Sequence, residues 1–269
     1  MSTIVVTGMG SGIGAACGKI LEERGHTPVG VDLRGAEFDA DLSSPEGIAD
    51  AVARVVEKYP QIDGVIANAG TQSNSPLDLK VNFFGARDTV RAFLPYLEKA
   101  ENGRAVITAS CASLQPSDPK LVQLLLDDQR EEALAYGKEL AAQGPMQGYA
   151  NYACSKRAIA TWVRRAAVSE EFAGRGVGLN AVGPGVVATP MTKELLSTEE
   201  GRKQAFGALP APYHGASEAR DIADALVFFV TGLSRTITGQ ILYIDGGADA
   251  ILRGEDIWHA PKSMDAPAQ

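Results

Sequence analysis

TIVVTGMGSGIGAA, residues 3–16, passes from an apolar strand pattern into a glycine-rich turn and then into a helical pattern. Two glycine patterns overlap in it, a GxGxxA that begins at Gly10 and a TGxxxGxG that begins at Thr7. The second is favoured because the strand pattern ends at Thr7. Glycines at such a turn let the backbone approach a pyrophosphate, which the free N–H groups of the helix N-terminus can bind. The stretch therefore predicts a dinucleotide site that includes Gly8, Ser11, Gly12, Ile13 and Gly14.

Beyond this stretch, short apolar runs alternate with helical periodicity along most of the chain. Such alternation is typical of a parallel sheet covered by helices on both faces, and right-handed crossovers favour a doubly wound topology. We therefore predict one α/β domain over residues 1–269, with a Rossmann-type sheet of about seven strands. The expected strands are 3–7, 27–33, 37–41, 64–68, 105–109, 176–182 and 241–245, and the expected helices are 12–24, 45–58, 76–100, 152–173 and 217–231.

Residues 114–147 depart from this alternation, since they have helical character and no strand pattern. Asp118 and Pro119 form a helix start, and LVQLLL follows with a strongly apolar face. A second helix is expected over residues 128–143, ending at Gly144. We interpret this segment as a helical insertion.

The composition excludes several classes of partner. A net charge of −8 and a pI near 5.0 argue against nucleic acid or an anionic membrane surface. No apolar run approaches the roughly 20 residues of a membrane span, and the N-terminus lacks the regions of a signal peptide, so we expect a cytoplasmic protein. The cysteines and histidines form no CxxC, HxxxH or mixed cluster, so no metal site is expected. Residues 256–269 are interpreted as a C-terminal tail.

Two residues bear on the choice of dinucleotide. Asp32 ends the second strand pattern, where a carboxylate can accept hydrogen bonds from the adenosine ribose and would repel a 2′-phosphate. Arg34 could pair with that phosphate instead. NAD is therefore the expected cofactor, and NADP is the less favoured alternative.

The stretch QGYANYACSK, residues 147–156, offers two tyrosines to one lysine. Tyr152 and Lys156 would lie one turn apart on the same face of a helix, whereas Tyr149 precedes the lysine by seven positions. An ammonium close to a phenol lowers the phenol pKa, which lets the phenol exchange a proton with a carbonyl or an alcohol. The first spacing therefore suits alcohol and ketone chemistry.

Eight motifs, in this order and across nearly the whole chain, resemble the short-chain dehydrogenase/reductase family. Within the family the chain is most similar to the bacterial 3α-hydroxysteroid dehydrogenase/carbonyl reductase type, because of its VDLR segment, its insertion and the DGGADAILR near its end. Ala67 and Ala109 depart from the usual pattern, which has an asparagine and often a serine at these positions. The motifs are TGMGSGIG at 7–14, DL at 41–42, ANAG at 67–70, VNFFG at 81–85, ITASCAS at 107–113, YACSK at 152–156, PGVVATP at 184–190 and DGG at 245–247.

The resemblance implies a catalytic set of four residues. Ser110 would hydrogen-bond the substrate oxygen, and Tyr152 would transfer its proton. Lys156 would bind the nicotinamide ribose and lower the tyrosine pKa, while Asn82 would hold a water that links the lysine to solvent. Further cofactor contacts are implied for Asp41, Leu42, Asn68, Ala69, Gly70, Pro184, Gly185, Val187 and Thr189, in addition to Tyr152 and Lys156.

Enoyl reductases of the same superfamily use a Tyr-x6-Lys pair, which Tyr149 and Lys156 match. Those relatives usually lack the TGxxxGIG and NAG patterns and carry an aromatic residue where Ser110 stands. We therefore predict that Tyr152 is the acid. Tyr149 is expected to be a wall of the cleft or a core residue.

Residues 190–215 occupy the family's substrate-loop position. Their apolar side chains would either line a pocket or form the buried stripe of a loop helix; they are Met191, Leu195, Leu196, Phe206 and Leu209. An apolar lining favours a hydrophobic secondary alcohol and its ketone, of steroid, terpenoid or aryl type. An aryl- or coniferyl-alcohol dehydrogenase is the alternative. A non-catalytic dinucleotide sensor is disfavoured, because such proteins commonly lose the tyrosine or the lysine.

The insertion is also expected to affect assembly. In many relatives the helix that carries the tyrosine packs against a second subunit, and an insertion beside this helix would obstruct that contact. Leu121, Leu124 and Leu125 would form an apolar patch that requires burial on the domain or across a two-fold axis. We expect a homodimer with the insertion at its interface.

Overall fold

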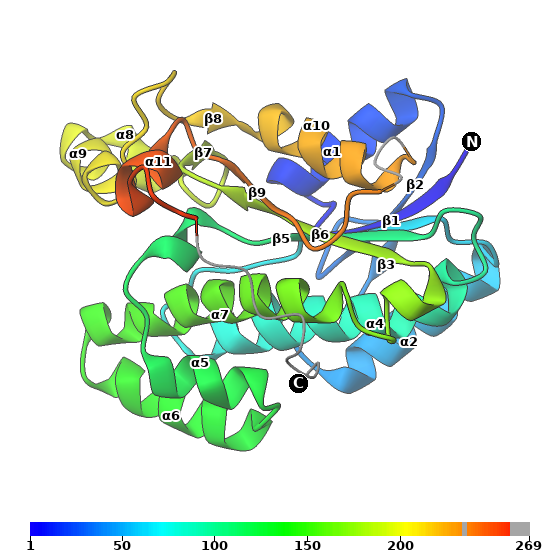
Figure 1. Cartoon of the computed structure of the whole chain (residues 1–269), viewed down its shortest axis with the longest axis horizontal. Helices are drawn as coiled ribbons and strands as arrows, with labels where there is room; N and C mark the ends of the chain where they lie inside the picture. Colours follow the sequence, from blue (N-terminus) through cyan, green and yellow to red (C-terminus); the bar gives the residue numbers. More distant parts are fainter. Residues whose placement is uncertain (233–235, 259–269) are drawn as a thin grey trace.

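A sheet of seven parallel strands, in the order β3-β2-β1-β4-β5-β6-β9, forms the centre of the protein (Figure 1). The structure is a computed structural model, and it describes residues 1–232 and 236–258. The chain builds the sheet outward in both directions from β1, so the strand order reverses between β1 and β4. The strands are β1 Thr3–Thr7, β2 Thr27–Asp32, β3 Phe38–Asp39, β4 Gly64–Ala67, β5 Arg104–Thr108, β6 Gly178–Pro184 and β9 Ile241–Ile244.

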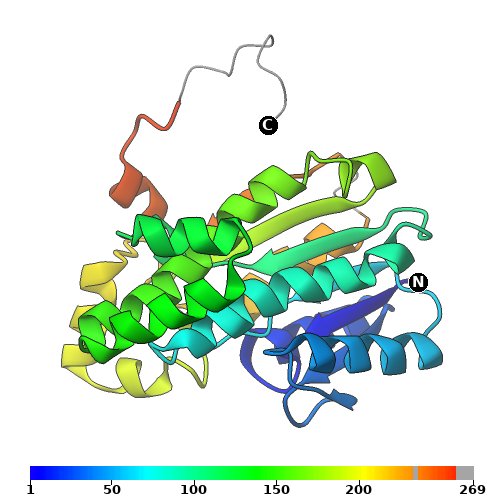
Figure 2. The same cartoon turned by 90° about the horizontal axis from the view of Figure 1, so that it is seen from below.

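Helices cover both faces of this sheet (Figures 1 and 2). The central strand shows why, since Ile4, Val5 and Val6 are all fully buried. Val5 belongs to the apolar core on one face, and Ile4 and Val6 belong to the core on the other. The predicted doubly wound fold is confirmed. One face is covered by α1 Gly12–Glu23 and α10 Ala219–Val230, and the other by α2 Pro45–Lys58, α4 Ala86–Leu97 and α7 Pro145–Ala166.

The helix predicted over residues 76–100 is divided into three parts. A short α3, Pro76–Asp78, leads into a π-helix, Leu79–Gly85, which continues into α4. The wider turn brings the chain against the loop after β3, where a Cβ on Gly85 would lie 2.5 Å from the Leu42 carbonyl oxygen. Segments of π-helix are rare and often occur at functional sites.

The insertion consists of α5, Pro119–Leu126, and α6, Arg130–Ala142, packed on the outer side of α7 (Figure 2). Asp118 caps α5 by accepting a hydrogen bond from the Leu121 amide at 2.9 Å. Gly144 does end the second helix, but Pro145 immediately begins α7, seven residues earlier than the predicted start at 152.

The apolar face of α5 is buried within the chain itself. Leu121 and Leu125 are fully buried in the core that includes α7, and Leu124 packs against that core. Of the two predicted ways to bury these leucines, on the domain or across a two-fold axis, the structure shows the first. Their burial is explained by α7 and α6, which together cover α5.

Shorter elements complete the described chain. The short helices are η2 Cys111–Leu114, η3 Ala173–Arg175, α8 Lys193–Ser197, α9 Glu199–Ala208 and α11 Ala248–Arg253, and β7 Val187–Ala188 pairs with β8 Ser217–Glu218. None of the helices in residues 1–232 and 236–258 is sufficiently long and apolar to span a membrane. Residues 259–269 of the predicted tail lie outside the described residues.

Candidate active site

A cavity of about 1110 Å³ lies at the carboxyl edge of the sheet. Its lining comes from the glycine turn, from the loops after the central strands, from α7 and from the substrate loop. Loops at this edge converge at the point where the strand order reverses, which is the usual ligand site of such sheets. The cavity thus brings together segments from both halves of the sequence.

The glycine turn forms one end of this cavity. Gly8 and Gly12 have φ angles of 72° and 53°, a region that favours glycine. A Cβ on Gly14 would lie 2.0 Å from the Gly8 carbonyl oxygen, so only glycine fits where α1 crosses the turn. Gly8, Ser11, Gly12 and Ile13 line the cavity, while Gly14 supports the turn from behind.

Asp32 joins this turn to the end of β2. Its Oδ2 accepts a hydrogen bond from the Gly10 amide at 2.8 Å, and its side chain lines the cavity. Arg34 is exposed and does not line the cavity. The next loop adds Asp41 and Leu42 to the lining, and a hydrogen bond from the Ser43 amide holds the pKa of Asp41 below its usual range.

The floor between the two ends is the segment after β4. The Thr7 hydroxyl accepts hydrogen bonds from the amides of Asn68 and Ala69, both at 3.0 Å. The Thr108 hydroxyl donates to Asn68 Oδ1 at 3.0 Å. These bonds fix Asn68, Ala69 and Gly70 along the cavity, as the sequence predicts.

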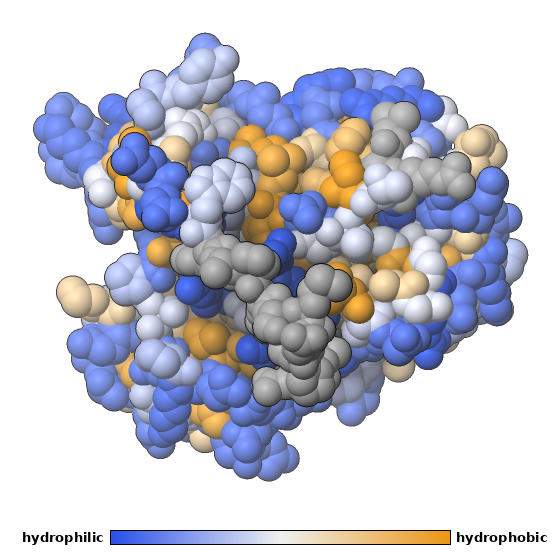
Figure 3. All heavy atoms as spheres, viewed as in Figure 1, coloured by the Kyte–Doolittle hydropathy of each residue, from blue (hydrophilic) through white to orange (hydrophobic). Residues whose placement is uncertain are grey.

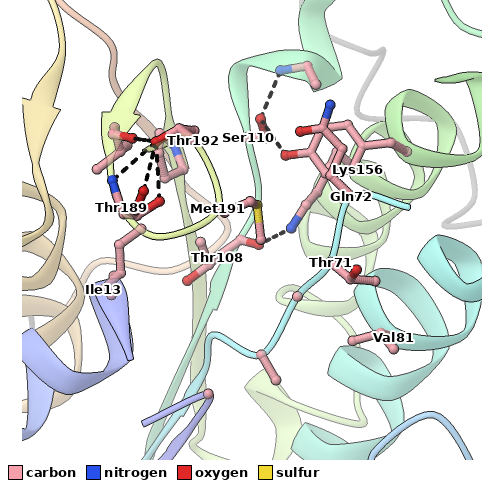
Figure 4. A pocket seen from close by; sticks show the side chains of 18 of the residues that line it. Ile13, Thr71, Gln72, Val81, Thr108, Ser110, Lys156, Thr189, Met191 and Thr192 are labelled. Carbon is pink, nitrogen blue, oxygen red and sulfur yellow. Dashed lines mark hydrogen bonds between the residues drawn. The ribbon is translucent and has the colours of Figure 1, made fainter. Parts of the chain in front are cut away.

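Ser110, Tyr152 and Lys156 meet beside this floor. Tyr152 and Lys156 lie one turn apart on α7, and the Tyr152 hydroxyl lies 3.5 Å from the Ser110 hydroxyl at the end of β5. The Lys156 ammonium donates to the Thr108 carbonyl oxygen at 2.9 Å (Figure 4). All three side chains line the cavity, so a substrate oxygen placed there can reach both hydroxyls.

Burial governs the pKa values of this group. It lowers the pKa of Lys156 to about 8, an effect that the charge of Asp78 partly offsets. Burial also raises the pKa of Tyr152, and the hydrogen bond with Ser110 opposes this shift. The lysine was expected to lower the tyrosine pKa, whereas burial, the largest cause, leaves the pKa of Tyr152 above its ordinary value.

Tyr149 lies one turn before Tyr152 on α7 but has a different partner. Its hydroxyl donates to Gln115 Oε1 at 2.7 Å, and burial raises its pKa strongly. It lines the cavity together with Gln115 and Met146, which belong to the insertion and to the first turn of α7. Tyr149 is therefore a wall of the cleft, the first of its two predicted positions.

Asn82 is the one predicted catalytic residue that does not line the cavity. It is almost fully buried in the π-helix, where Oδ1 accepts from the Thr71 amide at 2.9 Å and Nδ2 donates to the Thr71 carbonyl at 2.8 Å. Nδ2 also donates to the Ser155 hydroxyl at 3.2 Å. Asn82 thus connects the floor of the cavity to α7 from behind.

The remaining wall is the loop after β6. Pro184, Gly185, Val187 and Thr189 line the cavity, as predicted. The Thr192 hydroxyl holds this loop by accepting from the Thr189 amide at 3.1 Å and donating to the Val187 carbonyl (Figure 4).

The substrate loop covers the cavity with apolar side chains. Met191, Leu195 and Leu209 line it, and Leu196 and Phe206 do not. Three of the five side chains therefore have the first predicted position, and Leu196 and Phe206 are half-buried beside the cavity. Met146, on the first turn of α7, lines the same cavity.

Several residues of the site carry no recognisable pattern in the sequence. Thr108 orients Lys156 through a backbone carbonyl, which any residue could supply, so only its place before Ser110 hints at this role. Gln115 belongs to the insertion, and Met146 belongs to the first turn of α7. The periodicity did not predict that α7 begins this early. Within the described residues, no group of three His, Cys, Asp or Glu side chains could hold a metal ion.

The chain belongs to the short-chain dehydrogenase/reductase family of oxidoreductases. The short chain dehydrogenase family model matches residues 2–121, and the enoyl-(acyl carrier protein) reductase model matches residues 134–249. The predicted family, and with it the prediction of an oxidoreductase, is confirmed.

Particular relatives extend over nearly the whole chain. It is 35% identical to the 3-alpha-hydroxysteroid dehydrogenase/carbonyl reductase of Comamonas testosteroni, over 94% of this chain and 98% of that one. It is 30% identical to the coniferyl-alcohol dehydrogenase of Pseudomonas sp. strain HR199, over 91% and 95%. The crystal structure of the 3-alpha-hydroxysteroid dehydrogenase of Pseudomonas sp. B-0831, complexed with NADH, is similar with a TM-score of 0.85 and 35% identity, over 95% of this chain and 100% of that one.

Proposed function

We propose that the protein is an NAD(H)-dependent oxidoreductase that interconverts a hydrophobic secondary alcohol and its ketone. The observation that carries this proposal is the 3.5 Å approach of the Tyr152 and Ser110 hydroxyls inside the cavity, with Lys156 one turn along α7. Similarity to a 3-alpha-hydroxysteroid dehydrogenase/carbonyl reductase supports the reaction class.

The protein's own residues fit a dinucleotide. The glycine turn leaves the backbone at the N-terminus of α1 uncovered by side chains, and position 14 has no room for a Cβ. Asp32 lines the cavity beside the turn, where its carboxylate can accept from ribose hydroxyls, whereas Arg34 lies outside. NAD is therefore favoured over NADP, and the similar enzyme complexed with NADH supports this choice. When bound, the nicotinamide supplies the hydride chemistry.

The protein residues then have separate roles in moving the proton. The Ser110 hydroxyl, held by the Ala112 amide at 3.1 Å, hydrogen-bonds the substrate oxygen. The Tyr152 hydroxyl gives a proton to that oxygen in ketone reduction and takes one from it in alcohol oxidation. Lys156, fixed by the Thr108 carbonyl, places a positive charge near the phenol and favours its ionised form. Asn82 supports the arrangement by holding Thr71 and Ser155.

An enoyl reductase is the second candidate, because residues 134–249 match the enoyl-(acyl carrier protein) reductase model and Tyr149 precedes Lys156 by seven positions. The hydroxyl of Tyr149 already donates its proton to Gln115, which argues against this residue as the proton donor. The contact between Tyr152 and Ser110 favours carbonyl chemistry.

The substrate class follows from the apolar rim of the cavity. Met146, Met191 and Leu195 line it and remain 80%, 55% and 39% exposed, so a bulky apolar substrate could bury them. Steroid, terpenoid and aryl alcohols all satisfy this requirement. An aryl- or coniferyl-type alcohol is the closest alternative, and the similar coniferyl-alcohol dehydrogenase favours it.

We also propose a cytoplasmic homodimer. Since the leucines of α5 are buried, the interface is better sought at the edge strand β9 and at α11, where Leu242, Ile251 and Leu252 are exposed. Figure 3 shows apolar surface in the region of these two elements. Light scattering should give twice the monomer mass, and Ile251→Asp should lower it.

The function is tested by measuring NAD reduction with a panel of secondary alcohols that includes steroids, terpenols and aryl carbinols. Activity with at least one hydrophobic member is expected. Activity on enoyl thioesters alone would favour the second candidate, and NAD binding without turnover of any substrate would favour a sensor.

A further inference from the structure

Asp78 is a fully buried carboxyl group for which the proposed function has no role. It lies at the junction of α3 and the π-helix. Its Oδ1 accepts from the Ser73 amide at 2.7 Å and from the Ser73 hydroxyl at 3.0 Å, and its Oδ2 accepts from the Ser75 amide at 3.4 Å. Burial raises its pKa, and these donors oppose the rise. Three donors aimed at two oxygens suit an ionised carboxylate, which only accepts.

The loop that Asp78 holds, residues 71–75, forms part of the cavity wall and touches α7. Asn74 has a φ of 55°, and its carbonyl lies so near α7 that a Cβ on Gly148 would come within 2.8 Å of it. At its other end, Thr71 is held by Asn82, which in turn bonds Ser155. The loop is thus connected to α7 at positions on both sides of Tyr152.

We propose that Asp78 is a positioning residue for Tyr152 and Lys156: its carboxylate holds loop 71–75 in the shape that contacts α7 before Tyr152, at Gly148, and next to Lys156, at Ser155. This inference rests on the proposed roles of Tyr152 and Lys156.

The same carboxylate acts on both residues through its charge. Asp78 raises the pKa of Lys156, which burial lowers, and it adds to the rise that burial causes in the pKa of Tyr152. Among the described residues, the other titratable groups that face Tyr152 are Lys156, whose ammonium lies 5.9 Å from the ring centroid, Cys111, whose thiol has a raised pKa, and the phenol of Tyr149. Asp78 therefore does two things: its carboxylate holds loop 71–75, and its negative charge acts on Tyr152 and Lys156.

The test is a pH titration of phenolate absorbance in the NAD-saturated protein, with Tyr152→Phe subtracted in each background to isolate Tyr152. In Asp78→Asn the negative charge is lost, so the midpoint of the Tyr152 titration should move to lower pH by at least about half a unit.

The acid limb of the pH profile of kcat for oxidation of 1-phenylethanol should move in the same direction. The value of kcat should also fall, because the loop loses a hydrogen-bond acceptor. Asp88→Asn is the matched control, since Asp88 is a half-buried carboxylate on α4 paired with Arg87 and Arg130.

An unchanged Tyr152 midpoint in Asp78→Asn, a rise to higher pH, or an equal shift in Asp88→Asn would overturn the inference. If Asp78→Asn does not fold, Asp78→Ser replaces it, because its hydroxyl can still accept from the Ser73 amide. Absence of turnover in the wild-type protein would contradict the proposed function but not the inference about Asp78, since the absorbance titration needs no substrate.

Discussion

The rings of Tyr149 and Tyr152 lie 5.8 Å apart on α7, yet their hydroxyls have separate partners. Tyr149 donates to Gln115, and Tyr152 approaches Ser110. The two tyrosines are three positions apart on a helix, so they share one side of α7, while only the later one reaches the end of β5. The two tyrosines are therefore separable by experiment.

Tyr152→Phe should lower kcat by roughly 10²–10⁴-fold, because the proton donor is lost, and should leave NADH binding intact. Tyr149→Phe is the matched variant and should cost less than about tenfold, since it removes only a hydrogen bond to Gln115. Steady-state kinetics and NADH fluorescence titration measure both effects. An inactive Tyr149→Phe together with an active Tyr152→Phe would support the enoyl reductase.

Lys156→Met should inactivate the enzyme and yet stabilise the fold near neutral pH. The folded pKa of Lys156 is about 8, below the ordinary 10.5, so burying the ammonium destabilises the protein fully below pH 8. That cost declines as the pH rises through the window from about 8 to 10.5, because the folded lysine is then already neutral.

Removing this lysine should raise the free energy of unfolding at pH 7 by roughly 1–3 kcal/mol, after allowance for the lost bond to Thr108. Urea unfolding at several pH values measures the difference, with Lys138→Met on the insertion as a control. A gain that persists unchanged above pH 10.5 would contradict this account.

Asp32→Ala should narrow the preference for NAD over NADP by at least about tenfold in kcat/KM, since it removes an acceptor for ribose and a repulsion of phosphate. It should also weaken NAD binding, because the Gly10 amide loses its partner. Arg34→Ala should change the NAD kinetics little, as this side chain lies outside the cavity. A wild-type preference for NADP would mean that Arg34 governs cofactor choice.

Met191→Ser should raise KM several-fold for a bulky apolar alcohol, because less apolar surface is buried, and should affect a small alcohol little. Val168→Ser is a suitable control, since Val168 is also an exposed apolar residue and lies outside the cavity. Equal losses for large and small alcohols would show that Met191 supports the loop rather than the substrate.

Leu125→Ala should destabilise the protein by about 2–5 kcal/mol, because this side chain is fully buried between the insertion and α7. Deleting residues 118–145 should then give insoluble or unfolded protein. Thermal unfolding and size-exclusion chromatography check both outcomes. A folded deletion variant with altered assembly would restore the original expectation for the insertion.

The strands and the glycine turn could be predicted because their signals are local. Buried parallel strands appear as apolar runs, and the turn between Thr7 and Gly12 requires glycine at particular positions. The predicted catalytic and cofactor residues at the carboxyl edge followed from the motifs, and all of them except Gly14 and Asn82 line the cavity.

Other features depend on contacts that no local pattern contains. The π-helix needs one extra residue per turn, and the side chains of residues 79–85 do not differ from those of an ordinary buried helix. Gly144 was interpreted as a stop, but in the structure it also precedes Pro145 at the first position of α7. Asp78 was not predicted because its partners are two loop amides and the Ser73 hydroxyl, a combination that has no sequence pattern.

The unbroken course of α7 from Pro145 to Ala166 has a consequence for the size of the substrate. Met146 at the rim and Tyr152 beside the reacting oxygen are six residues apart on one helix, which corresponds to about 9 Å along its axis. The spacing of Met146 and Tyr152 along α7 therefore sets the length that a substrate needs in order to contact both. An alcohol must extend about that far from its carbinol to reach Met146, and inserting one residue between the two would turn Met146 away by about 100°.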